Sequence, residues 1–243
     1  LNVFGGNNFN GSVTGNINIL VEQKDPDCPE KIEHVATEGG CPVNINKLCG
    51  GGNMADSEVA NIDIRCCDHI GTVYGGAEAA NMKGDVNLMI KAGNIGTVFG
   101  GNNQSGEIQG DITVTVNWTY DCEKNSLGNV YGGGNLAQYT GTTTVNILNC
   151  EMSGSVFGGG KGKRTNGTGA HVLGNTNVNI GDWKDTDHVT IGGNVFGGGD
   201  EASVEGNSCV TIRDCETKIG GDVYGGGNAA NIYATDVTMW GGT

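Results

Sequence analysis

Four glycine-rich strings in the sequence match the dinucleotide-binding fingerprint G-x-G-x-x-A. They are GGGNMA at 50–55, GGGNLA at 132–137, GGGDEA at 197–202 and GGGNAA at 225–230. That fingerprint holds a pyrophosphate at the N-terminus of a helix that comes directly after it. No helical spacing of apolar residues comes after any of the four strings. We therefore interpret them as a signature of the fold and predict no nucleotide cofactor.

One further string resembles a phosphate site, and one of the four strings above resembles a calcium site. GGGKGKRT at 158–165 is similar to a P-loop, but Arg164 stands where that loop requires Ser or Thr. We interpret its basic cluster, Lys161, Lys163 and Arg164, as a solvated loop, with an anion contact as the alternative. GGGDEA resembles the calcium-binding GGxGxD repeat, which works only in uninterrupted tandem. Here the copies are at least 25 residues apart, so we predict no metal site.

The nine cysteines are an odd number, so at least one has no partner within the chain. Cys28 and Cys41 lie in one proline-containing segment, and we predict a disulfide between them. Cys122 and Cys150 fall in neighbouring repeats and could also meet. The sequence has no C-x-x-C pair that would suggest a zinc site, and no His lies near a Ser or Cys in a known nucleophile pattern. The sequence predicts no catalytic residue.

An internal repeat organises the whole chain. The string V-(F/Y)-G-G recurs seven times, and a degenerate copy, LCGGGN, starts at residue 48. The shortest spacing between copies is 25 residues, from Val73 to Val98, and longer spacings are this unit plus an insertion. The motif valines are Val3, Val73, Val98, Val130, Val156, Val195 and Val223.

A second element, an apolar–polar–apolar triplet, lies inside each unit. Its alternation and β-branched residues are typical of a half-buried strand, and Gly with Asn, Asp, Thr or Ser before the strands suits sharp corners. Two strands and two corners in 25 residues describe one coil of a solenoid, since a propeller blade needs about 40 residues. The triplets are 17–19, 62–64, 86–88, 112–114, 145–147, 178–180, 210–212 and 237–239.

We therefore predict one all-β domain over residues 1–243, a parallel β-solenoid of about eight coils, right-handed by the crossover rule. Ile64, Leu88 and Val114 should stack in successive coils. Insertions are expected at 21–47, which holds all three prolines, and at 117–129, 161–173 and 181–194. Most of them come after triplets, so one edge of the rod carries either a binding face or tolerated surface loops.

The residues after the motif valines form a ladder of their own. Strict alternation turns the valine inward and the ring outward, where exposed rings could bind glycans or associate with another copy. Alternatively, the glycine pair lets the strand bend and the rings pack inside, which we favour because exposed apolar ladders aggregate. The ladder comprises Phe4, Tyr74, Phe99, Tyr131, Phe157, Phe196 and Tyr224, with Cys49 in the second unit.

Composition excludes several classes of partner. The 27 acidic and 13 basic residues give a formal charge of −14, which repels nucleic acid and anionic lipid. No apolar run approaches the ~20 residues of a membrane span. With 46 Gly and 3 Pro, the chain suits neither a helical domain nor collagen.

Two motif copies, GNVYGGGN at 128–135 and GGDVYGGGN at 220–228, resemble the V-(F/Y)-G-G-G repeats of large surface or secreted β-solenoid proteins of gut bacteria, the Bacteroidota especially. More broadly, the chain is similar to β-helical adhesins. The resemblance implies an extracellular or cell-surface location and transfers no catalytic residue.

We expect a non-catalytic structural or adhesive protein whose partners are glycans or host surface proteins. The alternative is a carbohydrate-active β-helix, a polysaccharide lyase or hydrolase. Such enzymes need clustered charged residues on one face, and the middle positions of the triplets hold one acid, Asp63, and no base. Neither end of the sequence carries a capping pattern, so we also expect a segment of a longer shaft, or end-to-end self-association.

Overall fold

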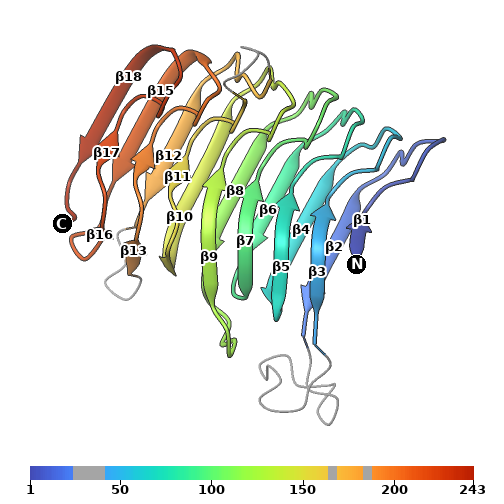
Figure 1. Ribbon diagram of the computed structural model, residues 1–243, viewed down its shortest axis with the longest axis horizontal. Coiled ribbons are helices and arrows are strands. Elements are labelled where there is room, and N and C mark those ends of the chain that lie inside the picture. Colours follow the sequence, from blue (N-terminus) through green and yellow to red (C-terminus); the bar gives the residue numbers. More distant parts are fainter. Residues whose placement is uncertain (24–41, 164–168, 183–187) are drawn as a thin grey trace.

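The computed structural model describes residues 1–23, 42–163, 169–182 and 188–243 (Figure 1). In these ranges the secondary structure consists of β-strands without helices, which confirms the predicted all-β class. The chain winds in coils that stack along one axis, and two long parallel sheets run the length of the stack. In the described part no helix is long and apolar enough to cross a membrane.

One sheet, which we call the motif sheet, is built from the V-(F/Y)-G-G strands in coil order. Its neighbours are all parallel, and the register places motif on motif, so that Val73 lies between Leu48 and Val98. The strands are β1 (Asn2–Phe4), β3 (Asn44–Cys49), β5 (His69–Tyr74), β7 (Asn94–Phe99), β9 (Ser126–Tyr131), β11 (Val156–Phe157), β14 (Val195–Phe196) and β17 (Val223–Tyr224).

The triplets lie in the second sheet, which we call the triplet sheet. Two short strands, β13 (Val189–Ile191) and β16 (Lys218–Ile219), extend its C-terminal half. Strand β13 pairs with the end of β10, and β16 pairs with β13. The main strands are β2 (Ile17–Glu22), β4 (Ala60–Cys66), β6 (Val86–Ile90), β8 (Ile112–Asn117), β10 (Thr143–Met152), β12 (Thr176–Ile180), β15 (Val204–Ile212) and β18 (Ile232–Met239).

The register of the triplet sheet corrects one prediction. Leu88 pairs with Ile62 on one side and Val114 on the other, whereas Ile64 pairs with Ile90. The expected stack of Ile64 on Leu88 is therefore wrong by two residues. Strand β4 carries two overlapping triplets, and a period-two pattern cannot tell which of them aligns with its neighbours.

The core lies between the two sheets and is closed by inward rows of Val, Ile and Leu. One inward row changes chemistry along the stack: it is apolar in the first four coils and becomes hydroxyl-bearing in coils five to seven. There Thr143, Thr176 and Ser208 donate hydrogen bonds of 2.6–2.7 Å across the core to the first motif glycine of the next coil. These bonds tie the two sheets together.

The first motif glycine is required by close packing. A Cβ on Gly75 would overlap the carbonyl oxygen of Gly100 in the next coil and press on Val86 across the core. The glycine is therefore kept even in the second coil, where Cys49 replaces the ring.

The terminal coils pair on one side only within the described residues: β1 with β3, β2 with β4, β17 with β14, and β18 with β15. In the last coil Val237 and Met239, which continue inward rows, are 43% and 53% exposed. The expectation that further coils stack on this segment stays a prediction.

Candidate functional site

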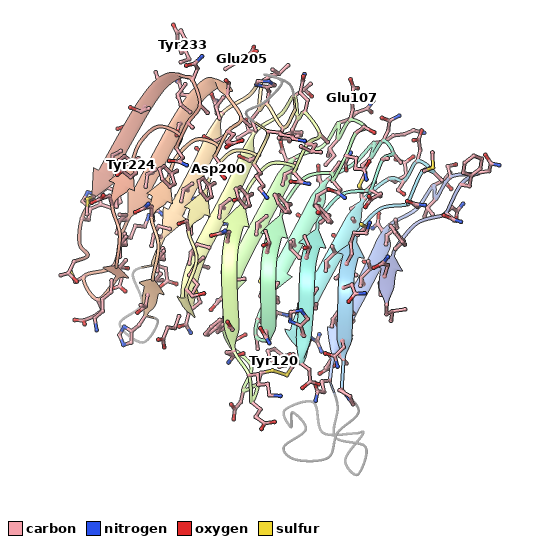
Figure 2. All side chains as sticks on the ribbon, viewed as in Figure 1. Glu107, Tyr120, Asp200, Glu205, Tyr224 and Tyr233 are labelled. Carbon is pink, nitrogen blue, oxygen red and sulfur yellow. A yellow bond between two sulfur atoms is a disulfide. The ribbon has the colours of Figure 1, made fainter. Side chains whose placement is uncertain are left out.

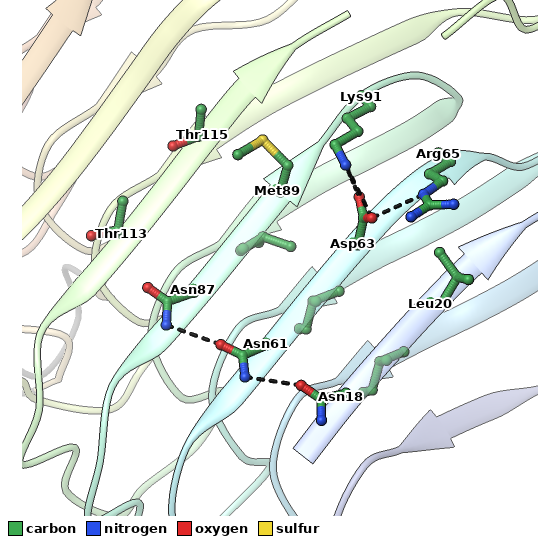
Figure 3. Close-up of a pocket in the computed structure, with 13 residues that line it drawn as sticks. Asn18, Leu20, Asn61, Asp63, Arg65, Asn87, Met89, Lys91, Thr113 and Thr115 are labelled. Atoms are coloured by element: carbon green, nitrogen blue, oxygen red, sulfur yellow. Dashed lines mark hydrogen bonds and ion pairs between the residues drawn. The ribbon is translucent and has the colours of Figure 1, made fainter. Parts of the chain in front are cut away.

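A hollow of about 470 Å³ lies on the outer face of the triplet sheet, across β2, β4, β6 and β8 (Figure 3). Its size falls in the range of small-molecule sites, about 300–1,000 Å³. The side chains drawn and labelled around it come from four successive coils: Asn18, Leu20, Asn61, Asp63, Arg65, Asn87, Met89, Lys91, Thr113 and Thr115.

An amide row forms one side of the hollow. The register aligns Asn18, Asn61, Asn87 and Thr113. Asn61 Nδ2 donates to Asn18 Oδ1 at 3.0 Å, and Asn87 Nδ2 donates to Asn61 Oδ1 at 3.1 Å. The bonds fix the orientation of the amides, and each amide has two hydrogens and an oxygen, so the row keeps capacity to bind other groups.

The next outward row combines apolar and charged side chains. Leu20, Asp63, Met89 and Thr115 are in register, and Leu20 is 53% exposed. The middle positions of the predicted triplets therefore do not form one row, because Asp63 is in register with Leu20 and Met89 and not with Asn18 and Asn87. The apolar side chains here were missed for the same reason.

A charge cluster closes the hollow at the other side. Asp63 accepts hydrogen bonds from Arg65 Nε at 2.9 Å and Lys91 Nζ at 3.0 Å, and Arg65 Nη1 lies 3.6 Å from Glu22 Oε2. The hydrogen bond to Asp63 raises the pKa of Arg65, which stays protonated. The negative charges of Asp63 and Glu22 balance the positive charges of Arg65 and Lys91. Sequence reasoning missed both bases because Arg65 lies one outward position beyond its triplet and Lys91 lies two outward positions beyond its own.

Tyr120 covers the two cations of this cluster. Its ring centroid lies 5.5 Å from Arg65 Cζ and 5.7 Å from Lys91 Nζ, within cation–π range. The loop between β8 and β9 carries Tyr120 to the lower edge of the coils in Figure 2. Thr119 N and Tyr120 N both donate to Lys91 O, at 3.0 and 3.3 Å, which docks the loop on the preceding coil.

A disulfide between Cys66 and Cys122 anchors that loop. It joins the end of β4 in the second coil to a loop of the fourth coil, with a Cα–Cα distance of 5.7 Å. Buried Ala92, from the third coil, packs in the same cluster as the two cysteines. The suggested approach of Cys122 to Cys150 is therefore wrong: Cys150 is a free, buried thiol. The predicted pair Cys28–Cys41 lies outside the described residues.

The ring ladder stacks along the motif sheet as its spacing predicts. Successive rings from Tyr74 to Tyr224 are 4.6–5.1 Å apart between centroids and within 11° of parallel. They form a cluster separate from the main core, so alternation holds and the rings lie on the opposite side of the strand from the valines. The rings from Tyr74 to Phe196 are nevertheless only 3–7% exposed.

At the two ends the ladder is more open. Phe4 is partly buried, with Lys47 Nζ 5.6 Å from its ring centroid, and Tyr224 is 43% exposed. The five rings between these ends present no face to solvent. The rings thus point outward, as strict alternation predicts, and do not pack inside with the valines. They are nevertheless buried and do not form an exposed row.

A row of polar residues lies beside the rings. The fifth residue after each motif valine occupies it, and we call it the cover row. Asn135 Nδ2 donates to Asn103 Oδ1, and Asn103 Nδ2 donates to Glu78 Oε1, both at 2.9 Å. The cover row comprises Asn8, Asn53, Glu78, Asn103, Asn135, Lys161, Asp200 and Asn228.

The cover row contacts the ladder directly. Tyr131 Oη lies 3.4 Å from Asp200 Oδ2, and Cys49 Sγ lies 3.8 Å from Glu78 Oε2. Figure 2 shows Asp200 on the same side of the coils as Tyr224. Burial, assisted by Glu78, raises the pKa of Cys49 and of Tyr74 to about 12. The asparagines of the GGGN strings are thus part of the cover row that lies beside the rings.

Glu78 is the most strongly held carboxylate of the cover row. It accepts from Lys47 Nζ at 2.7 Å, from Asn103 Nδ2 at 2.9 Å and from Gln104 Nε2 at 2.9 Å. Burial disfavours its charged form, but these three donors outweigh burial, and the pKa of Glu78 is lowered. Its side chain is 9% exposed.

The other candidate sites from the sequence do not gather into one place. Lys161 occupies a cover-row position, and Arg164 of the same basic cluster lies outside the described residues. Within residues 1–23, 42–163, 169–182 and 188–243, no three His, Cys, Asp or Glu side chains are grouped so that they could hold a metal ion.

Comparison with known proteins identifies no relative of this chain. No protein-family model matches it, and no curated protein or solved structure is significantly similar to it.

Proposed function

We propose that this chain is a non-catalytic extracellular protein with a structural or adhesive role, part of a shaft made of stacked coils. The observation that carries the proposal is the series of side-chain hydrogen bonds that run from coil to coil. Such bonds occur on the triplet sheet, as in Asn18–Asn61–Asn87, and in the cover row, as in Glu78–Asn103–Asn135. A solenoid gains stability from its nearest-neighbour contacts, so these rows suit a stiff shaft.

The Cys66–Cys122 disulfide supports the extracellular location. Disulfides persist in oxidising compartments and are rare where glutathione keeps thiols reduced. This bond spans three coils and closes a loop with a sequence separation of 56 residues. The resemblance of the motif to bacterial surface repeats points in the same direction.

A carbohydrate-active β-helix is the second candidate, because Asp63, Arg65, Lys91 and Tyr120 gather beside the hollow. Glycoside hydrolysis uses two free carboxyl groups, one of them an acid of raised pKa. Asp63 is instead bound by two cations, at 2.9 and 3.0 Å. Arg65, with its raised pKa, is a poor base for a lyase. The cluster is better suited to holding its own geometry than to moving protons.

The two functions differ in whether products form. Purified protein is incubated with a panel of neutral and uronic-acid polysaccharides, and new reducing ends and unsaturated uronates are measured over a day. We expect no release above a heat-denatured control. Release by the native protein that disappears in Asp63→Asn would establish the enzyme and refute the non-catalytic proposal.

A further inference from the structure

The hollow on the triplet sheet is formed by side chains alone. Strands β4 and β6 are each paired on both sides, so their backbone groups are used within the sheet. A peptide that adds to a sheet as an extra strand needs a free edge, and these strands offer none here. A ligand at this place must be recognised by the outward rows.

The amide row offers paired donors and acceptors. Asn87 is exposed and donates one amide hydrogen to Asn61. An amide has a second hydrogen and an oxygen with which to bind a ligand. Thr113 continues the row with a hydroxyl that both donates and accepts. Neighbouring strands repeat these groups every ~4.8 Å. Such a row matches a chain of hydroxyl groups, which also donate and accept.

Beside the amides lie two apolar side chains. Leu20 is 53% exposed, and Met89 stands in the same row two coils further on. Methionine adapts its shape to irregular apolar surfaces. The hollow therefore offers hydrogen bonds along one row and, along the next, two apolar side chains on either side of Asp63. This arrangement fits the hydroxyl edges and the C–H faces of sugar rings.

The charges argue for an uncharged ligand. Asp63 and Glu22 balance Arg65 and Lys91, and these cations already contact Asp63 and the ring of Tyr120. The protein as a whole carries −14, which disfavours the approach of uronate or sulfate groups.

We infer that the hollow binds a neutral oligosaccharide lying across β2, β4, β6 and β8, with Asn61, Asn87 and Thr113 on its hydroxyl groups and Leu20 and Met89 against its rings. This inference rests on the proposed adhesive function and supplies its ligand class. It also moves glycan binding from the ring ladder, where the rings are covered, to the opposite sheet.

The test begins with the intact 243-residue chain on an array of immobilised oligosaccharides. The array carries gluco-, manno-, galacto- and xylo-oligosaccharides, uronic-acid and sulfated chains of matched length, and unglycosylated peptides. We expect retention on at least one neutral series and none on the anionic series. Retention only on anionic chains or on peptides, or on no glycan at all, would overturn the inference.

The variants then locate the binding. Asn61→Ala combined with Asn87→Ala should weaken the solution Kd for the best-retained oligosaccharide by tenfold or more, since two net hydrogen bonds are worth about that factor. Asn177→Ala is the matched control, because Asn177 occupies the same row in the sixth coil, outside the hollow. It should bind within about twofold of wild type.

Circular dichroism and urea midpoints show whether each variant is folded. Leu20→Asp provides a second route, because its side chain is already half-exposed, and it should also weaken binding about tenfold if the apolar row is used. If folded variants at both rows bind like wild type, the site is elsewhere, and the adhesive proposal stands without this hollow. If the variants lose binding while wild type releases products, the hollow is right and the non-catalytic proposal fails.

Discussion

The two sheets of this solenoid treat their outward side chains in opposite ways. On the motif sheet the outward rings from Tyr74 to Phe196 are buried, although alternation turns them away from the core. On the triplet sheet the outward amides, Leu20 and Met89 border a hollow. An outward position in a strand is therefore not the same as an exposed one.

The path of the chain after each strand makes the difference. After the motif strand the chain turns at its glycines and places the cover row beside the rings, with contacts such as Tyr131–Asp200 and Cys49–Glu78. After β8 the chain instead forms the loop to β9 at the edge of the sheet. Tyr120 and the disulfide hold this loop over the charge cluster. In the part of the chain that the structure describes, the hollow beside this cluster stays open.

The difference between the two sheets is tested most directly by removing one outward side chain from each of them. Phe157→Ala deletes a ring stacked on both neighbours and should lower the free energy of unfolding by about 3–5 kcal/mol. Thr144→Ala, at an outward position of the triplet sheet in the adjacent coil, should change it by less than about 0.5 kcal/mol. Urea denaturation monitored by circular dichroism measures both. Equal losses would show that the two faces are equivalent.

The disulfide should matter next. Replacing Cys66 and Cys122 by Ser frees a closed loop with a sequence separation of 56 residues and should cost about 2–4 kcal/mol. Cys209→Ser, at a free and partly exposed thiol, should leave the urea midpoint nearly unchanged and serves as the control. An unchanged midpoint in the double variant would mean that docking of the loop on Lys91 O suffices without the bond.

The contribution of the cover row to stability can be tested at Glu78, through the dependence of the unfolding free energy on pH. Because its folded pKa is lowered from the ordinary value of 4.5, the charged carboxylate stabilises the fold above that value, and this contribution is lost as pH falls through the folded pKa. Glu78→Gln should cost about 1–3 kcal/mol at pH 7 and show a flatter loss of stability on acidification. Urea midpoints at a series of pH values measure it. Glu151→Gln, at an exposed position, is the control; identical profiles for the two variants would remove Glu78 from this role.

The repeat alone was enough to predict the coils, the two parallel sheets and the stacking of rings. The reason is physical: coils that pair strand on strand share one spacing, so residues at the same place in each unit must lie above one another. The valine positions and the ring ladder are direct consequences of this rule.

Tertiary structure decided the features that depend on more than one coil. The register at β4 is set by pairing with β2 and β6, because both overlapping triplets satisfy the local pattern. The bond from Cys66 to Cys122 depends on a loop that reaches back past the third coil. The hollow needs side chains from four strands, and the contact between Tyr131 and Asp200 needs a turn that brings the cover row beside the rings. Local alternation determines which way a side chain points, and only the path of the rest of the chain determines what it meets.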